Sequence, residues 1–132
     1  MKVTIESTHG ELNFKGTNGR GQSLQFSGSS ESVSPMESVL MSVAACSAID
    51  VEIFLNKMRQ PLDHIEVEVK GVQVDAVPAI FSDIHLHYKI YGDVKVDKAA
   101  KAVEMSMEKY CSVSIMLQKG VNITHSHEVI NS

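Results

Sequence analysis

The sequence lacks an excess of positive charge and an N-terminal hydrophobic run. It has 12 Lys and Arg against 16 Asp and Glu, a net charge of −4, so no basic field attracts a polyanion. The N-terminal stretch MKVTIESTHG alternates apolar and polar residues and has neither the apolar region of a signal peptide nor a membrane-spanning run. We therefore expect a cytoplasmic protein that binds neither nucleic acid nor membrane.

Internal repeats are also absent, and cysteine is scarce. The 132 residues, 43% of them apolar and 21% charged, are typical of one globular domain, expected over residues 1–132. The two cysteines are Cys46 and Cys111. Cytoplasmic reductants keep ordinary thiols reduced, so an intracellular pair is more often catalytic, sensing or metal-binding than structural. Inert filling of the core is the alternative.

Periodicity predicts an α+β fold. Residues alternate as in strands at 2–7, 11–15, 22–27, 65–69, 84–90 and 121–125, and have helical spacing at 36–58, 98–109 and 112–117. We predict a turn at residues 16–21, a Ser/Gly-rich linker at 27–34, and helix caps at Ser34 and Asp97. The resulting order, βββ-α-ββ-α(α)-β, is not an alternation of strand and helix, which favours antiparallel sheets beside helices.

The predicted helix over residues 36–58 is apolar on more than one face. Few charges interrupt its first four turns, which is typical of a buried helix. A sheet covers only one side of such a helix. The other side is therefore expected to contact a second copy of the chain, in an intimate homodimer.

Cys46 lies on this helix among small residues, in the segment Ala44-Ala45-Cys46-Ser47-Ala48. Small neighbours leave space for a small molecule or for another element, although close helix crossing alone would also favour them. Asp50 follows one turn later, and its negative charge disfavours a thiolate unless a cation neutralises it.

Cys111 stands where one predicted helical segment ends and the next begins. If it begins the second segment, the free amides and the helix dipole favour its thiolate, and Lys109 adds positive charge. These features predict a lowered pKa for Cys111. The 65 positions between the two cysteines do not by themselves bring the sulfur atoms together.

Four of the six histidines occur as two spaced pairs, His85-x-His87 and His125-x-His127, each on a predicted strand. Such a pair presents two imidazoles on one face, a spacing that metal sites use. An exposed sheet face explains the same pattern, and no carboxylate or cysteine stands at motif spacing beside the pairs. We favour the exposed face and predict no metal site.

Two motifs suggest a family. The segment PMESVL at residues 35–40 leading into Ala44-Ala45-Cys46, followed later by Lys109-Tyr110-Cys111-Ser112-Val113, resembles the OsmC/Ohr family of small peroxidases, and most closely its YhfA-like branch. The resemblance covers nearly the whole chain. It implies a swapped α+β homodimer in which antiparallel sheets wrap around central buried helices.

The resemblance also implies a function in oxidative stress, the thiol-dependent reduction of organic hydroperoxides. Cys46 would attack the peroxide and become a sulfenic acid, and Cys111 would condense with it to form a disulfide. An external dithiol, a lipoyl group or a small thiol, would then reopen that disulfide. No metal, haem or flavin is required, so no cofactor is expected.

In peroxidatic family members an arginine from an early loop pairs with a glutamate ten positions before the first cysteine. Arg20 lies in such a loop here, but Met36 occupies the glutamate position and Glu37 is one residue later. Nine residues of straight helix turn through about 900°, which places Glu37 opposite Cys46 unless the first turn is distorted. Arg20 and Glu37 are the candidate activating residues by position alone.

A non-peroxidatic interpretation remains open. The same fold could serve a binding or thiol-sensing protein, with an apolar ligand cleft at the dimer interface and the cysteines lining it.

Overall fold

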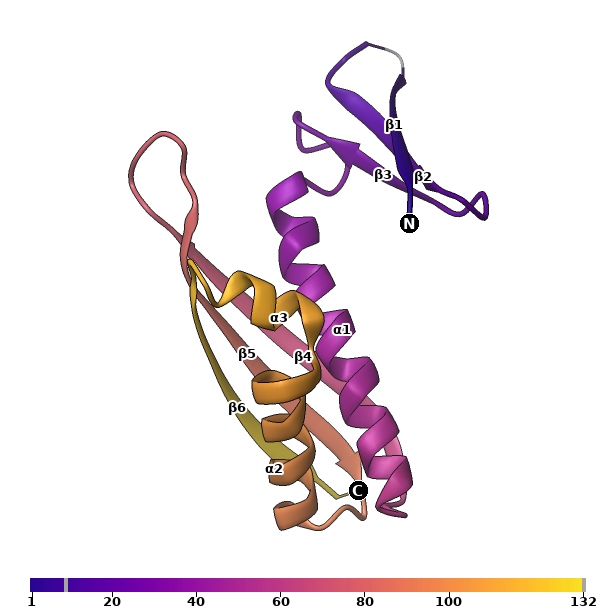
Figure 1. Cartoon of the computed structure of the whole chain (residues 1–132), viewed down its shortest axis with the longest axis vertical. Helices are drawn as coiled ribbons and strands as arrows, with labels where there is room; N and C mark the ends of the chain where they lie inside the picture. Colours follow the sequence, from indigo (N-terminus) through magenta and orange to yellow (C-terminus); the bar gives the residue numbers. More distant parts are fainter. Residues whose placement is uncertain (9, 132) are drawn as a thin grey trace. The chain divides into compact units, whose positions relative to one another are not determined.

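The computed structural model describes residues 1–8 and 10–131 and has the predicted α+β architecture. Figure 1 shows the elements in chain order. They are β1 (Val3–Thr8), β2 (Asn13–Asn18), β3 (Ser23–Ser27), α1 (Pro35–Lys57), β4 (Leu62–Gln73), β5 (Phe81–Gly92), α2 (Val96–Met105), the π-helix η1 (Ser106–Tyr110), α3 (Ser112–Leu117) and β6 (Asn122–Ile130). The chain forms two compact units, Met1–Val39 and the part that begins at Leu40.

The first unit is an antiparallel meander in the order β1-β2-β3. The predicted turn at residues 16–21 starts too early, because β2 continues to Asn18. The Asn18 side chain accepts hydrogen bonds from the backbone N–H groups of Arg20 and Gln22, each at 3.0 Å. Gly21 closes the turn with φ +82°, a conformation that glycine adopts without strain.

One face of this meander is apolar and uncovered within the unit. Ile5, Phe14 and Leu24 lie on that face by register and are all exposed. A cavity of about 560 Å³ on the unit is lined by Ile5, Phe14, Phe26 and the start of α1. An exposed apolar sheet face of this kind is typical of an interaction surface.

The second unit contains the sheet β4-β5-β6, with helices on one face (Figure 1). The β4 and β5 strands are antiparallel, but β5 and β6 are parallel, so the expectation of purely antiparallel sheets is wrong for this sheet. The chain passes through α2, η1 and α3 between them, a crossover long enough to return in the same direction. Alternate residues of β5, from Ile84 to Ile90, are fully buried beneath the helices.

The α1 helix buries one stripe within the chain. Val43, Ser47, Val51 and Leu55, spaced one turn apart, are buried. Other apolar side chains of the helix are exposed: Met41 by 57%, Ile49 by 60% and Ile53 by 43%. By length and apolar composition alone this 23-residue helix could also cross a membrane, a property that the core helices of globular proteins share.

The C-terminal helical region differs from the prediction in two respects. The predicted cap Asp97 is wrong: Lys95 is the N-cap residue of α2, without a side-chain hydrogen bond, and Asp97 lies in the first turn. The α-helix also ends at Met105, not near Lys109, because the next turn is the π-helix η1. The Tyr110 ring lies 5.2 Å from the Phe54 ring of α1, edge to face, so η1 is held against that helix.

Candidate redox site

The two cysteines of the chain meet between α1 and the junction of η1 with α3. Cys111 is the N-cap residue of α3, and its thiol lies within hydrogen-bonding reach of the Cys46 thiol. The Cys111 S–H also donates to the carbonyl of Val43, at 3.9 Å, one turn before Cys46. Both thiols are free. The fold therefore brings together two cysteines that are 65 positions apart in the sequence.

Exposure distinguishes the two thiols. Cys46 is half-buried, whereas Cys111 is fully buried. A reagent that arrives from solvent therefore reaches the Cys46 thiol before the Cys111 thiol.

The prediction of a lowered Cys111 pKa is wrong. Burial raises the pKa of Cys111 to about 11, and its hydrogen bond with Cys46 and the charges of Cys46 and Asp50 add to the increase. The predicted N-cap geometry is present: the Ser114 N–H donates to Cys111 Sγ at 3.5 Å. This hydrogen bond lowers the pKa of Cys111. The effect of burial on the pKa outweighs the effect of the hydrogen bond from that one amide. The Cys111 side chain is therefore a neutral thiol at neutral pH.

A chain of polar side chains lies beside the thiols. The Tyr88 hydroxyl of β5 is 2.5 Å from the Ser47 hydroxyl, which is 2.9 Å from the Ser106 hydroxyl. The Ser106 O–H donates to the Asp50 carboxylate at 3.2 Å. Hydrogen bonds therefore join β5, α1 and η1 at the level of Cys46. This network, Asp50–Ser106–Ser47–Tyr88, is called the buried polar chain below.

Its members Ser47, Tyr88 and Ser106 are all buried. Burial raises the pKa of Tyr88 to about 12, and the bond with Ser47 partly opposes this. Sequence reasoning missed all three residues. Ser47 had a signal: it is the polar member of an otherwise apolar stripe with Val43 and Val51, and a buried hydroxyl needs a partner.

The predicted activating residues lie in the first unit. The Arg20 side chain is exposed, and its Nε donates to the Gln22 side chain at 3.2 Å. The Glu37 carboxylate accepts the Ser34 N–H at 2.9 Å, and the Glu37 N–H donates to the Ser34 hydroxyl at 3.1 Å. This is a capping box, and the backbone hydrogen bond from Ser34 lowers the pKa of Glu37. The predicted cap Ser34 is confirmed.

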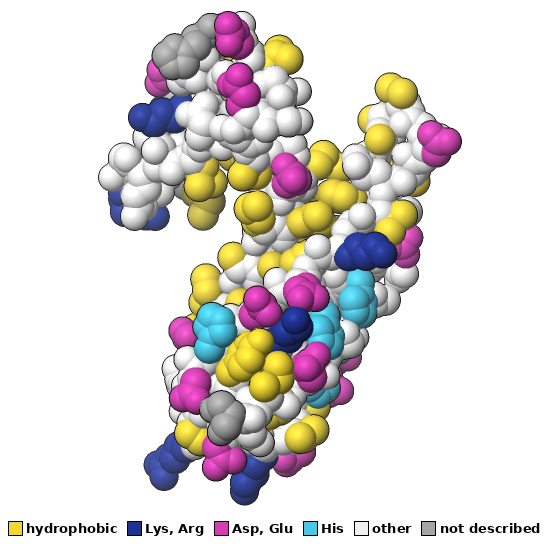
Figure 2. All heavy atoms as spheres, turned by 180° about the vertical axis from the view of Figure 1, so that it is seen from behind, with side chains coloured by type: hydrophobic (Ala, Val, Ile, Leu, Met, Phe, Trp, Pro, Cys, Tyr) yellow, Lys and Arg dark blue, Asp and Glu magenta, His cyan; other side chains and the backbone are white. Residues whose placement is uncertain are grey.

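The histidine pairs lie on opposite faces of the sheet. His125 and His127 stand in register with the buried residues Leu86 and Tyr88, so they belong to the helix-covered face. Figure 2 shows the side away from the helices, where His, Lys and acidic side chains gather over this unit. His85 and His87 belong to that outer face.

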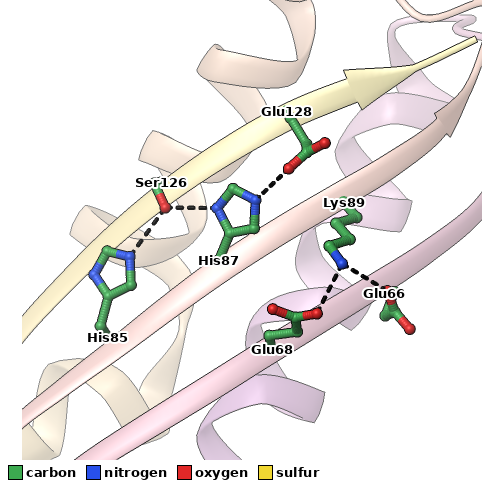
Figure 3. Close-up of polar contacts among 7 residues, drawn as sticks. All are labelled: Glu66, Glu68, His85, His87, Lys89, Ser126 and Glu128. Carbon is green, nitrogen blue, oxygen red and sulfur yellow. Dashed lines mark hydrogen bonds and ion pairs between the residues drawn. The ribbon is translucent and has the colours of Figure 1, made fainter.

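Figure 3 shows one hydroxyl and one carboxylate that engage the outer imidazoles. Ser126 Oγ lies 3.0 Å from His85 Nε2 and 2.6 Å from His87 Nδ1. His87 Nε2 is 2.6 Å from the Glu128 carboxylate. Beside them Lys89 bonds Glu68 at 2.7 Å, which lowers the pKa of Glu68. Within residues 1–8 and 10–131, no three His, Cys, Asp or Glu side chains are grouped to hold a metal ion.

The fold and the pair of adjoining free thiols define an α+β protein with a two-cysteine site. The family model described as OsmC-like protein matches residues 28–126. The chain belongs to the OsmC-like protein family.

Its relatives include proteins similar over their full length. The chain is 44% identical to Protein YhfA of Escherichia coli strain K12, over 98% of each chain. A hypothetical protein from Aquifex aeolicus has a similar crystal structure, with TM-score 0.91, 31% identity and coverage of 99% and 96% of the two chains. An organic hydroperoxide resistance protein OsmC from Legionella pneumophila shares the fold, with TM-score 0.74, 16% identity and coverage of 97% of each chain.

Proposed function

We propose that the protein is a thiol-dependent peroxidase that reduces organic hydroperoxides. The observation that carries the proposal is the contact between a half-buried thiol, Cys46, and a fully buried one, Cys111. The Legionella protein that shares this fold is an organic hydroperoxide resistance protein, which supports the same substrate class.

In the first step the Cys46 thiolate attacks the outer oxygen of the hydroperoxide. The O–O bond breaks, the alcohol leaves with one proton, and the sulfur becomes a sulfenic acid. Half-burial of Cys46 suits this role, because the peroxide must reach the sulfur from solvent.

In the second step the Cys111 thiol displaces the sulfenic hydroxyl. An S–S bond forms, the S–O bond breaks and water leaves. Cys111 is suited to resolve and not to attack peroxide, because it is buried and its raised pKa keeps it a thiol. An external dithiol, a lipoyl group or a small thiol, then reduces the disulfide by exchange, and the cycle needs no cofactor.

The working unit in this proposal is a cytoplasmic homodimer in which residues 1–132 act as one domain. The exposed apolar residues of α1, Met41, Ile49 and Ile53, support a second copy on that face. The apolar face of the first unit supports an intertwined arrangement in the same way. These apolar surfaces would also seat the alkyl part of the hydroperoxide.

Arg20 and Glu37 are the charged residues that we propose to activate Cys46 within the dimer. Arg20 is the stronger candidate, since Glu37 is engaged in the capping box with Ser34. Arg20→Ala should lower the rate of peroxide reduction without changing the thermal stability of the fold, while Arg59→Ala, another exposed arginine, should leave the rate unchanged.

The alternative is a binding or thiol-sensing protein with an apolar cleft at the dimer interface. The same exposed α1 residues support it, because a covered apolar face can enclose a ligand. Treatment of the reduced protein with cumene hydroperoxide separates the two. A peroxidase loses two thiols and about 2 Da in mass, whereas a binding protein keeps both thiols. Cys46→Ser should abolish turnover, and Cys111→Ser should leave Cys46 as a sulfenic acid that dimedone traps.

A further inference from the structure

We propose that Asp50 carries the Cys111 proton during disulfide formation and delivers it to the departing hydroxide, held in place for this by the Ser106 hydroxyl. The inference rests on the proposed peroxidase function. It assigns a role to a carboxylate that the family's arginine and glutamate pattern does not include.

Asp50 belongs to the same face of α1 as Cys46, since four residues of helix turn through about 400°. Its carboxylate accepts the Ser106 O–H at 3.2 Å. Ser106 in turn is tied to the Cys111 backbone, because the Cys111 N–H donates to the Ser106 carbonyl at 2.7 Å. Ser106 of the π-helix η1 is therefore hydrogen-bonded both to the Asp50 carboxylate and to the backbone of Cys111.

Cys111 and Ser106 contact α1 along nearly two turns of that helix. Cys111 Sγ contacts the helix at Val43, and the Ser106 hydroxyl contacts it at Ser47 and Asp50. Cys46 lies between these points in the sequence of the helix. The carboxylate, the sulfenic acid that would form on Cys46 and the resolving thiol therefore share one small region.

The chemistry needs a proton carrier there. The resolving sulfur must lose its proton as the S–S bond forms, and the sulfenic oxygen must gain one as the S–O bond breaks. The two transfers balance, so water is the only product besides the disulfide. The buried polar chain offers one carboxylate for both transfers, and the other members that face it, Ser47, Ser106 and Tyr88, are neutral hydroxyls.

In the alternative role, Asp50 slows disulfide formation. Its negative charge helps to keep the pKa of Cys111 high, so charge alone would make Asp50 an obstacle to resolution. Removing the charge would then speed disulfide formation. Proton transfer by Asp50 predicts that removing it slows the same step.

The test is single-turnover oxidation of the full-length reduced protein by one equivalent of cumene hydroperoxide, followed by rapid quench and intact mass. Asp50→Asn should still form the sulfenic acid, trapped by dimedone, but should form the disulfide at least about tenfold more slowly. Its disulfide rate should rise about tenfold per pH unit from pH 6 to 8, because the thiol must then ionise unaided. The wild-type rate should change little over that range. The other titratable groups at the site, Cys46 and Tyr88, are unaltered in the variant.

Glu52→Gln is the matched control, because it neutralises an exposed carboxylate on the same helix and should leave both steps unchanged. Ser106→Ala keeps the carboxylate but removes its hydrogen bond, and should slow the disulfide step only. A wild-type or faster disulfide rate in Asp50→Asn overturns the inference about Asp50 alone. A wild-type protein that forms neither sulfenic acid nor disulfide overturns the proposed peroxidase function itself.

Discussion

The Tyr88 hydroxyl lies 2.5 Å from the Ser47 hydroxyl, and Ser47 is the residue that follows Cys46 on α1. The bond joins the middle of β5 to the central helix in a region where both side chains are fully buried. A buried hydroxyl that lost this partner would incur the full cost of its desolvation. The pair therefore fixes the turn of α1 that carries Cys46 relative to the sheet.

Tyr88→Phe should change how the stability of the protein depends on alkaline pH. The pKa of Tyr88 is about 12 in the fold and 10.0 as the ordinary value, so the folded state holds the phenol proton more tightly. The associated stability is complete below pH 10 and is lost as pH rises towards 12, by about 3 kcal/mol for this two-unit difference. Tyr88→Phe should lower stability by about 1 kcal/mol at neutral pH but make the decline above pH 10 shallower. Urea unfolding at several pH values measures both.

Cys111 should be almost inert to alkylation in the native protein. With its pKa raised from 9.0 to about 11, the thiolate fraction at pH 8 is about a hundredfold smaller than in the unfolded chain, and burial blocks access as well. Iodoacetamide labelling followed by peptide mass spectrometry should show Cys111 reacting at least about a hundredfold more slowly in buffer than in urea. Equal rates in the two conditions would contradict the buried, neutral thiol.

Gly71→Ala should destabilise the second unit. A Cβ at this position on β4 would come within 2.5 Å of the Phe81 ring and 3.0 Å of the Leu40 side chain. Overpacking of this kind costs about 1–3 kcal/mol. Gly120→Ala is the control, because nothing lies within 4 Å of a Cβ there. Thermal unfolding should separate the two variants, and equal melting temperatures would contradict the close approach of the strand to the Phe81 ring.

Ser34→Ala should weaken the start of α1. It removes the hydroxyl that accepts the Glu37 N–H at 3.1 Å, at a cost of about 1 kcal/mol in the free energy of unfolding. Ser112→Ala removes an exposed hydroxyl from the first turn of α3 and serves for comparison. If chemical denaturation gave the same free energy for both variants, the capping box would not be stabilising the fold.

Ile49→Glu should disrupt the proposed homodimer. Ile49 is 60% exposed on α1, and a charge in an apolar interface is costly to desolvate. Sedimentation velocity should show a shift towards monomer, whereas Met116→Glu, at an equally exposed position on α3, should leave the oligomeric state unchanged. A wild-type sedimentation coefficient for Ile49→Glu would place the interface elsewhere.

The sequence was informative where local pattern decides structure. Helical spacing located α1 to within one residue at each end, and the serine before Pro35 identified its cap. The position of Cys111 at the start of a helical segment was also predicted. Each depends on residues a few positions apart.

Features that depend on distant residues were not predicted. Strand periodicity carries no direction, so it did not reveal that β6 runs parallel to β5. The pKa of Cys111 was predicted in the wrong direction because nearby amides and Lys109 are visible in the sequence, whereas burial is not. The bond between Ser47 and Ser106 joins residues 59 positions apart, and only the folded chain brings them together.

The wide turn from Ser106 to Tyr110 sets the direction in which Cys111 points. A π-helical turn holds one residue more than an α-helical turn, and each residue of an ordinary helix rotates the chain by about 100°. A single deletion within this turn would rotate the second thiol a quarter of a circle or more away from the first, without altering either cysteine. The extra residue of the π-helical turn therefore aligns the Cys111 thiol with the Cys46 thiol.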